Sequence, residues 1–254
     1  MEGAVELIQL REAPAPLPDQ QKLLAAYDDG VEAICRLAGQ FDESSWDART
    51  PCPEWCASVV AGHLRCVADD LHEYLDEAPA SRYARLMATG ADSELITRKL
   101  ARQNAAELAA LAEAAPADNV ASFATSARSY AARLPGVWNM PHHLYRDTLV
   151  TVGGMAAAAC AEWHLHAFDL AVALGSEYQP ADADVVLAAW LAGMPHLPLP
   201  PQHGQLASGR GLPGNPWHAV LAASGRGAAE AGREPGNGQP EARDPARSKK
   251  RRKG

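Results

Sequence analysis

The stretch "EWHLHAFDLAVALG", residues 162–175, sets the expectation for the fold. It is rich in Ala and Leu, which favour helix, and it ends in a glycine, which commonly terminates one. Glu162, His166 and Asp169 follow one another at spacings of four and three, so they lie along one stripe of that helix. A helix that otherwise belongs in a core needs a partner for three titratable groups, whether water, an opposite charge or a metal ion.

Apolar residues also recur at helical spacing on both sides of this stretch. In the segment 19–39, for example, Leu23, Tyr27 and Val31 form one apolar face. Further helices are expected over residues 56–77, 81–115, 155–175 and 181–192, with a short one over 215–226. Two Pro-containing segments break the pattern and are expected to be a loop (42–55) and a loop or short extended piece (133–147). The pattern predicts an all-α fold, mostly a helical bundle.

The composition is that of a globular protein, with 47% hydrophobic and 21% charged residues among 254. The N-terminal segment carries acidic residues and prolines where an export signal has basic residues and an apolar run. No run approaches the roughly 18 apolar residues of a membrane span. Five cysteines are an odd number, and without an export signal they predict reduced thiols and a cytoplasmic protein.

Charge is distributed unevenly along the chain. Residues 225–254 hold nine Lys and Arg against four Asp and Glu, whereas the rest holds 14 basic and 27 acidic residues. An acidic body argues against a nucleic-acid-binding core, and the basic tail is expected to be solvated, with weak nucleic-acid contacts at most. The expected divisions are an N-terminal extension (1–18), a helical bundle (19–194), a short irregular Pro- and Gly-rich region (195–226) and a disordered basic tail (227–254).

His63 is the best candidate for a third metal ligand beside Glu162 and His166. It lies three residues after Val60 on the apolar face of its helix, where an unpaired imidazole costs about 1–3 kcal/mol. The three residues give the two-His, one-carboxylate set of an open catalytic zinc site, with a position left for water or a thiol. Asp169 is then expected to hold the free ring nitrogen of a ligand histidine.

Other residues compete for these roles. His142 and His143 lie in a segment that is an alternative source of ligands, whereas His164 is expected to point to the face opposite His166. Three cysteines near His63 give a second candidate zinc cluster: Cys52, Cys56 and Cys66. Their C-x3-C spacing differs from the usual C-x2-C knuckle and lacks a paired second half, so small buried residues explain them better.

Two motifs resemble those of the mycothiol-dependent maleylpyruvate isomerase family. "TPCPEWCASVVAGHL", residues 50–64, is similar to a T-P-C-P-G-W run followed by a histidine eight positions after the tryptophan, as His63 follows Trp55. "EWHLHAFDLAVALG" is similar to the second motif, E-x3-H-x2-D-L-x2-A-x-G, and "LAASGR", residues 221–226, resembles a short end motif. The resemblance covers roughly residues 19–226.

The resemblance implies a DinB-like four-helix bundle, up-down-down-up, with a divalent metal between its helices. In the family this metal is usually zinc, and by position its ligands are His63, Glu162 and His166. The resemblance also implies mycothiol, a cytosolic thiol, as cosubstrate. A metal-bound thiolate would attack an electrophilic small molecule, leaving again in an isomerase and staying attached in a transferase.

The chain departs from the family pattern at three places. Glu54 replaces a glycine, Cys56 replaces a capping Ser or Thr, and a short end replaces the C-terminal domain whose arginine helps to bind maleylpyruvate. No arginine here is matched to that role, so a transferase or detoxifying enzyme, monomeric or homodimeric, is favoured over the named isomerase. The alternatives are a non-catalytic metal-binding module that regulates or sequesters, and a structural helical protein in which His63 lies far from Glu162.

Overall fold

The computed structural model describes residues 15–52, 55–76, 105–106, 108–109, 111, 113–145, 148–194 and 215–227, with the backbone alone at 143–145 and 148. Residues 228–254 of the predicted basic tail lie outside these residues, as does most of the predicted N-terminal extension and irregular region. The helices are α1 (Gln20–Ala38), α2 (Ala57–Asp76), α5 (Pro116–Arg133), α6 (Val152–Ala173), α7 (Ala183–Gly193) and α8 (Pro216–Ala223). The strands are β1 (Pro141–Tyr145) and β2 (Thr148–Thr151), and short 3-10 turns cover Ser45–Asp47 and Leu134–Gly136.

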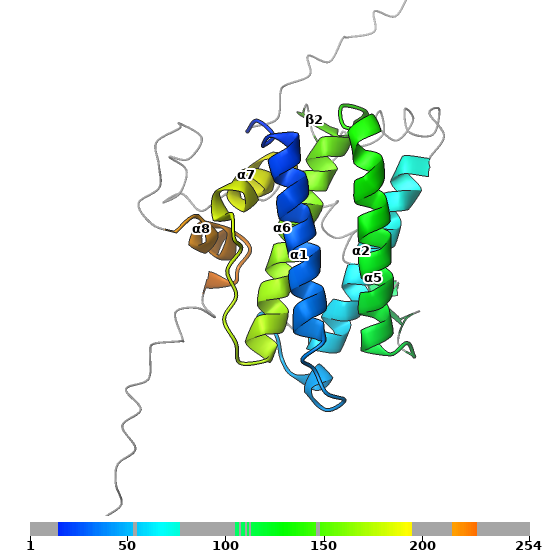
Figure 1. Cartoon of the computed structure of the whole chain (residues 1–254), viewed down its shortest axis with the longest axis vertical. Helices are drawn as coiled ribbons and strands as arrows, with labels where there is room; N and C mark the ends of the chain where they lie inside the picture. Colours follow the sequence, from blue (N-terminus) through cyan, green and yellow to red (C-terminus); the bar gives the residue numbers. More distant parts are fainter. Residues whose placement is uncertain are drawn as a thin grey trace, which may run out of the picture.

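Helices α1, α2, α5 and α6 form a four-helix bundle (Figure 1). Asp19 caps α1 by accepting hydrogen bonds from the backbone N–H groups of the first turn, and Thr151 caps α6 in the same way. The core centres on Trp163 of α6, whose ring makes edge contacts with Tyr27 of α1 at 5.9 Å and with Phe123 of α5 at 4.9 Å. All three side chains are fully buried, so one large aromatic group joins three of the four helices.

The bundle has the up-down-down-up arrangement of the DinB-like fold. Helix α2 runs antiparallel to α1 and α6 runs antiparallel to α5 (Figure 1). Helices α2 and α5 are parallel, because Arg65 donates a hydrogen bond to Asn119 at 3.2 Å and, farther along both helices, Arg133 donates to Asp76 at 2.6 Å. A long connection from residue 77 to 115 therefore returns the chain to the end of the bundle where α2 began.

One bundle helix, α5, was not predicted from the sequence. The prediction placed a helix over 81–115 instead; most of that range lies outside the described residues, of which 105–106 and 108–109 are helical. Helix α5 begins with Pro116 in its first turn, a position where proline is well tolerated. Its buried face, which includes Val120, Phe123 and Tyr130, is interrupted by polar residues that dilute the periodic signal. The helices predicted at 19–39, 56–77, 155–175, 181–192 and 215–226 are confirmed with small shifts of their ends.

The segment 133–147, expected to be a loop or a short extended piece, contains the first strand of an antiparallel pair, in which β1 lies beside β2 with an irregularity near His143. The hairpin closes the end of the bundle where α6 begins, and the backbone N–H of Gly153 donates to the carbonyl of Trp138 at 2.8 Å. The protein is therefore all-α with one small sheet.

Helix α7 lies against the outer face of α6, and α8 packs against α7 (Figure 1). They form a second apolar cluster in which Trp190 and Trp217 pack with Leu165 and Phe168 of α6. Because α6 is covered by the bundle on one side and by this layer on the other, most of its residues are buried. No helix among the described residues is long and apolar enough to cross a bilayer.

Candidate metal centre

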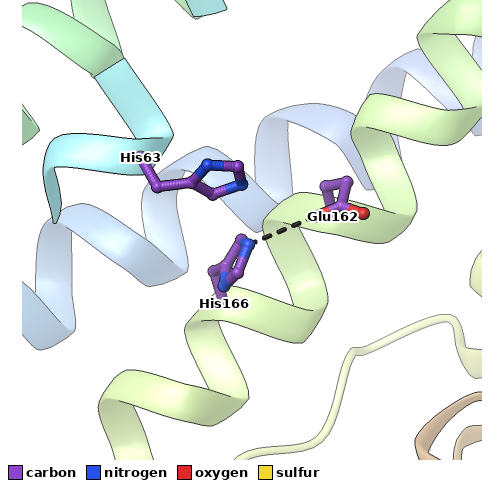
Figure 2. A group of neighbouring side chains, drawn as sticks. All are labelled: His63, Glu162 and His166. Carbon is purple, nitrogen blue, oxygen red and sulfur yellow. Dashed lines mark ion pairs between the residues drawn. The ribbon is translucent and has the colours of Figure 1, made fainter. Parts of the chain in front are cut away.

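Three side chains from two helices converge between α2 and α6. Figure 2 shows the ring of His63, from α2, facing Glu162 and His166, from α6. One potential ligand atom of each residue lies within 4.8 Å of those of the other two. Both histidines are buried, whereas the Glu162 side chain keeps 30% of its surface exposed, so the group is accessible to a small molecule. This geometry excludes the alternative in which His63 lies far from Glu162.

The turn before α2 places an aromatic ring over both histidines. Thr50 holds this turn, because its hydroxyl and its backbone N–H both donate to the carbonyl of Trp55, at 3.0 and 3.2 Å. The ring centroid of Trp55 lies 4.8 Å from that of His63, and the indole stacks at 19° on His166 with 6.2 Å between centroids. The tryptophan of the first motif thus forms an apolar wall of the site.

The two ring nitrogens of His166 have different partners. Nδ1 lies 2.9 Å from Oδ2 of Asp169, which is fully buried. A carboxylate accepts and does not donate, so Nδ1 carries a proton in this contact. Nε2 is buried and lies 3.1 Å from Oε2 of Glu162, yet this contact lacks the geometry of a hydrogen bond. Nε2 and a carboxylate oxygen thus lie close together without a hydrogen bond, an arrangement that a cation between the two would stabilise.

Electrostatics keep two of the candidate ligands, His63 and Glu162, in the protonation states that a metal requires. Burial lowers the pKa of His63 to about 3, so its imidazole is neutral at pH 7. Burial by itself would raise the pKa of Glu162, but the close contact with His166 lowers it to about 2, so the carboxyl group is ionised. For His166, burial favours the neutral ring, while Asp169 and Glu162 outweigh it and raise the pKa, so a metal that binds Nε2 displaces a proton from this ring. Two imidazoles and one carboxylate are a donor set that fits a divalent metal, and zinc in particular.

A guanidinium from the end of the chain completes this cluster. Arg226 donates from Nε to Oδ1 of Asp169 at 2.8 Å and from Nη2 to Oδ2 at 2.6 Å. Burial by itself would raise the pKa of Asp169, but the bonds from Arg226 and His166 lower it. Sequence reasoning did not assign this arginine, although it ends the "LAASGR" motif, residues 221–226, and that motif was its one signal.

The competing histidines and cysteines lie elsewhere or do not join the group. The ring of His142 packs against Tyr74, about three helical turns beyond His63, and the side chain of His143 is outside the described residues. His164 points away from the site, as predicted, toward α1. All five cysteines are free of disulfides, and within the described residues the one group suited to a metal contains no cysteine.

Comparison with known proteins supports the family assignment. The sequence model of the mycothiol maleylpyruvate isomerase N-terminal domain matches residues 27–171, more than half of the chain. The chain belongs to this family. Searches among curated proteins and among solved structures give no match. The match to the family covers most of the bundle, with all three converging residues and Asp169, and it ends before α7, α8 and Arg226.

Proposed function

We propose that this member of the mycothiol maleylpyruvate isomerase family binds one zinc ion, or another divalent metal, through His63, Glu162 and His166. With mycothiol as cosubstrate, it would act on an electrophilic small molecule as a thiol transferase or isomerase. The observation that carries the proposal is the convergence of these three donors within 4.8 Å at a partly open position of the family's own domain.

A bound divalent metal supplies a positive charge that deprotonates a coordinated thiol at neutral pH, which makes the thiol a nucleophile. The chain's own residues prepare the position. His63 is neutral and therefore ready to donate a nitrogen lone pair. Asp169 orients His166 through its Nδ1 proton, and Trp55 keeps water from one side of both rings. Because the Glu162 side chain is partly exposed, the thiol and the electrophilic substrate can reach the site from that side.

The charges around the site favour a single-charged anion as the additional ligand. Arg226 offsets the charge of Asp169 through its two hydrogen bonds, so Glu162 contributes one net negative charge. A divalent cation and one thiolate bring this partly buried cluster to neutrality, whereas a cation with neutral water leaves it positive. Because uncompensated buried charge is costly, the cluster is suited to a thiolate.

The nucleophile of this proposal comes from outside the chain. Among the cysteines of the chain, we consider Cys52 as an alternative nucleophile, because its thiol interacts electrostatically with Arg226 and Glu162. Burial raises the pKa of its thiol to about 11, so it is protonated at neutral pH and is a poor nucleophile. Cys52 is therefore not proposed as the nucleophile, and we assign this role to an external thiol. Because mycothiol is cytosolic, we place the reaction in the cytoplasm, in a monomer or homodimer.

A thiol titration tests this function. The protein is loaded with cobalt(II) as a spectroscopic substitute for zinc and titrated with mycothiol, and we expect a thiolate-to-metal absorption band that saturates. Zinc-loaded protein is then assayed with mycothiol plus monochlorobimane, whose thioether is fluorescent, and separately with mycothiol plus maleylpyruvate. Turnover above the uncatalysed rate with the bimane indicates a transferase, and turnover of maleylpyruvate indicates an isomerase.

Two results would count against the enzyme. Thiol binding without turnover of either compound supports the alternative of a non-catalytic module that binds metal to regulate or sequester. Absence of the thiolate band in cobalt-loaded protein contradicts a thiol-using site altogether. The His166→Gln variant serves as the control, because it keeps every cysteine of the chain and loses one proposed ligand.

A further inference from the structure

Arg226 reaches the centre of the protein from a segment that the family domain does not include. The matched domain ends at residue 171, whereas Arg226 follows α8. Its backbone is fixed by the end of that helix. Gly225 adopts a positive φ of 80°, and the N–H of Arg226 donates to the carbonyl of Leu221 at 2.7 Å, which is the pattern of a Schellman motif.

Helix α8 itself is anchored without the arginine. Trp217, Val220 and Leu221 are buried in the apolar cluster between α6, α7 and α8. Burying an Arg–Asp pair costs desolvation energy that a simple anchor does not require, since apolar residues of similar size often stabilise as well or better. The need to dock α8 therefore does not account for the ion pair.

The position of the Arg226–Asp169 ion pair beside His166 explains why a buried ion pair is present here. Asp169 is fully buried and accepts three hydrogen bonds: two from Arg226 and one from Nδ1 of His166. Arg226 donates the hydrogen bond that Oδ1 of Asp169 accepts, whereas Oδ2 accepts from both Arg226 and His166. The side-on, two-point contact prevents rotation of the carboxylate, because either rotation or tilting breaks one of the two bonds. The carboxylate in turn fixes the tautomer and the ring orientation of His166.

We propose that Arg226 is a positioning residue of the metal centre, acting through Asp169 on His166. The docked C-terminal segment thereby becomes part of a site whose ligands all lie in the bundle. The expected effect of Arg226, a higher affinity of the site for the metal, rests on the proposed function. The ordering of the His166 ring by Arg226 holds for the metal-free protein as well. Removal of an outer partner of a ligand histidine typically weakens metal binding by about 10–100-fold.

The test uses the full chain with Arg226→Gln and Arg226→Lys, beside Val220→Ala as a matched control. Val220 is fully buried in α8, so its truncation weakens the docking of the same helix without touching the ion pair. Three quantities are measured: the nitrogen and proton NMR signals of the His166 ring in metal-free protein, the zinc dissociation constant by chelator competition, and thermal unfolding of the metal-free protein.

We expect Arg226→Gln to weaken the protonated Nδ1 signal of His166 and to raise the zinc dissociation constant by about 10-fold or more. Arg226→Lys keeps the charge but not the two-point contact. Its ring signal and its zinc dissociation constant should therefore lie between those of the wild type and of Arg226→Gln. Val220→Ala lowers the unfolding temperature and leaves both the ring signal and the zinc affinity as in the wild type.

The proposal is overturned if Arg226→Gln behaves like Val220→Ala, with lower stability and an unchanged ring signal and zinc affinity. If the wild type binds no zinc, the proposed function fails instead. The NMR comparison of the metal-free proteins still decides whether Arg226 orders the ring of His166.

Discussion

Replacing His166 by glutamine is expected to abolish stoichiometric metal binding, whereas replacing His164, two residues away on the same helix, leaves it intact. His166 is one of three donors, with Nε2 facing Glu162 at 3.1 Å. Loss of a direct ligand should weaken binding by more than the roughly 10–100-fold that loss of an outer partner causes. Zinc content after dialysis, determined by elemental analysis, and the zinc dissociation constant of each variant measure the difference.

His164 is a suitable control because it is an equally buried histidine of the same helix whose ring makes structural hydrogen bonds away from the proposed metal ligands. Its Nε2 donates to the carbonyl of Ala26 at 2.8 Å, and its Nδ1 accepts from the hydroxyl of Tyr178 at 2.6 Å. His164→Gln should therefore lower the free energy of unfolding by about 1–3 kcal/mol while the metal is retained. If both variants keep stoichiometric zinc, or both lose it while remaining folded, the assignment of His166 as a ligand is wrong.

Among alanine substitutions of the described glycines, Gly193→Ala is expected to have the largest effect on stability. A Cβ atom at this position would lie 2.3 Å from the backbone nitrogen of Ala158 and 2.8 Å from the carbonyl oxygen of Gly154. These are backbone atoms of α6, which cannot move singly as a side chain can. The two helices must separate, and overpacking of this kind costs about 3 kcal/mol, which lowers the melting temperature by about 6–12 °C.

Gly136→Ala is the matched control, because a Cβ atom there meets no heavy atom within 4 Å. Thermal unfolding of the two variants measures the contrast, and Gly136→Ala should stay within about 0.5 kcal/mol of the wild type. A melting temperature for Gly193→Ala equal to that of Gly136→Ala would show that α7 does not approach α6 as closely as described.

The bundle was predictable where its helices carry a continuous apolar face and recognisable ends. Helix α1 shows both features, with the capping residue Asp19 before it and Gly39 after it. The candidate donors were predictable because Glu162 and His166 share one helical stripe and His63 occupies an apolar face. That they meet across two helices was a hypothesis from the residue types, and the resemblance strengthened it. Periodicity shows which face of a helix a residue occupies, but it does not show which helix lies against that face.

The rest depends on contacts between residues distant in sequence. Arg226 lies 57 residues from Asp169, and its place at the end of the "LAASGR" motif does not show which residue it contacts. The strand pair β1–β2 likewise depends on pairing between two segments of the chain. Its local sequence does not reveal this pairing, because two prolines and a glycine at residues 135–141 resemble an ordinary loop. Helix α5 was missed because polar residues interrupt its apolar face.

The zinc K-edge X-ray absorption spectrum, recorded before and after mycothiol is added, tests the central claim most directly. For a metal held by His63, Glu162 and His166, we expect nitrogen and oxygen neighbours at about 2.0–2.1 Å and no sulfur at first. One sulfur neighbour at about 2.3 Å should then appear with the thiol. Sulfur around the metal before any thiol is added would place zinc on the chain's cysteines, and a spectrum unchanged by mycothiol would contradict a thiol-binding metal centre.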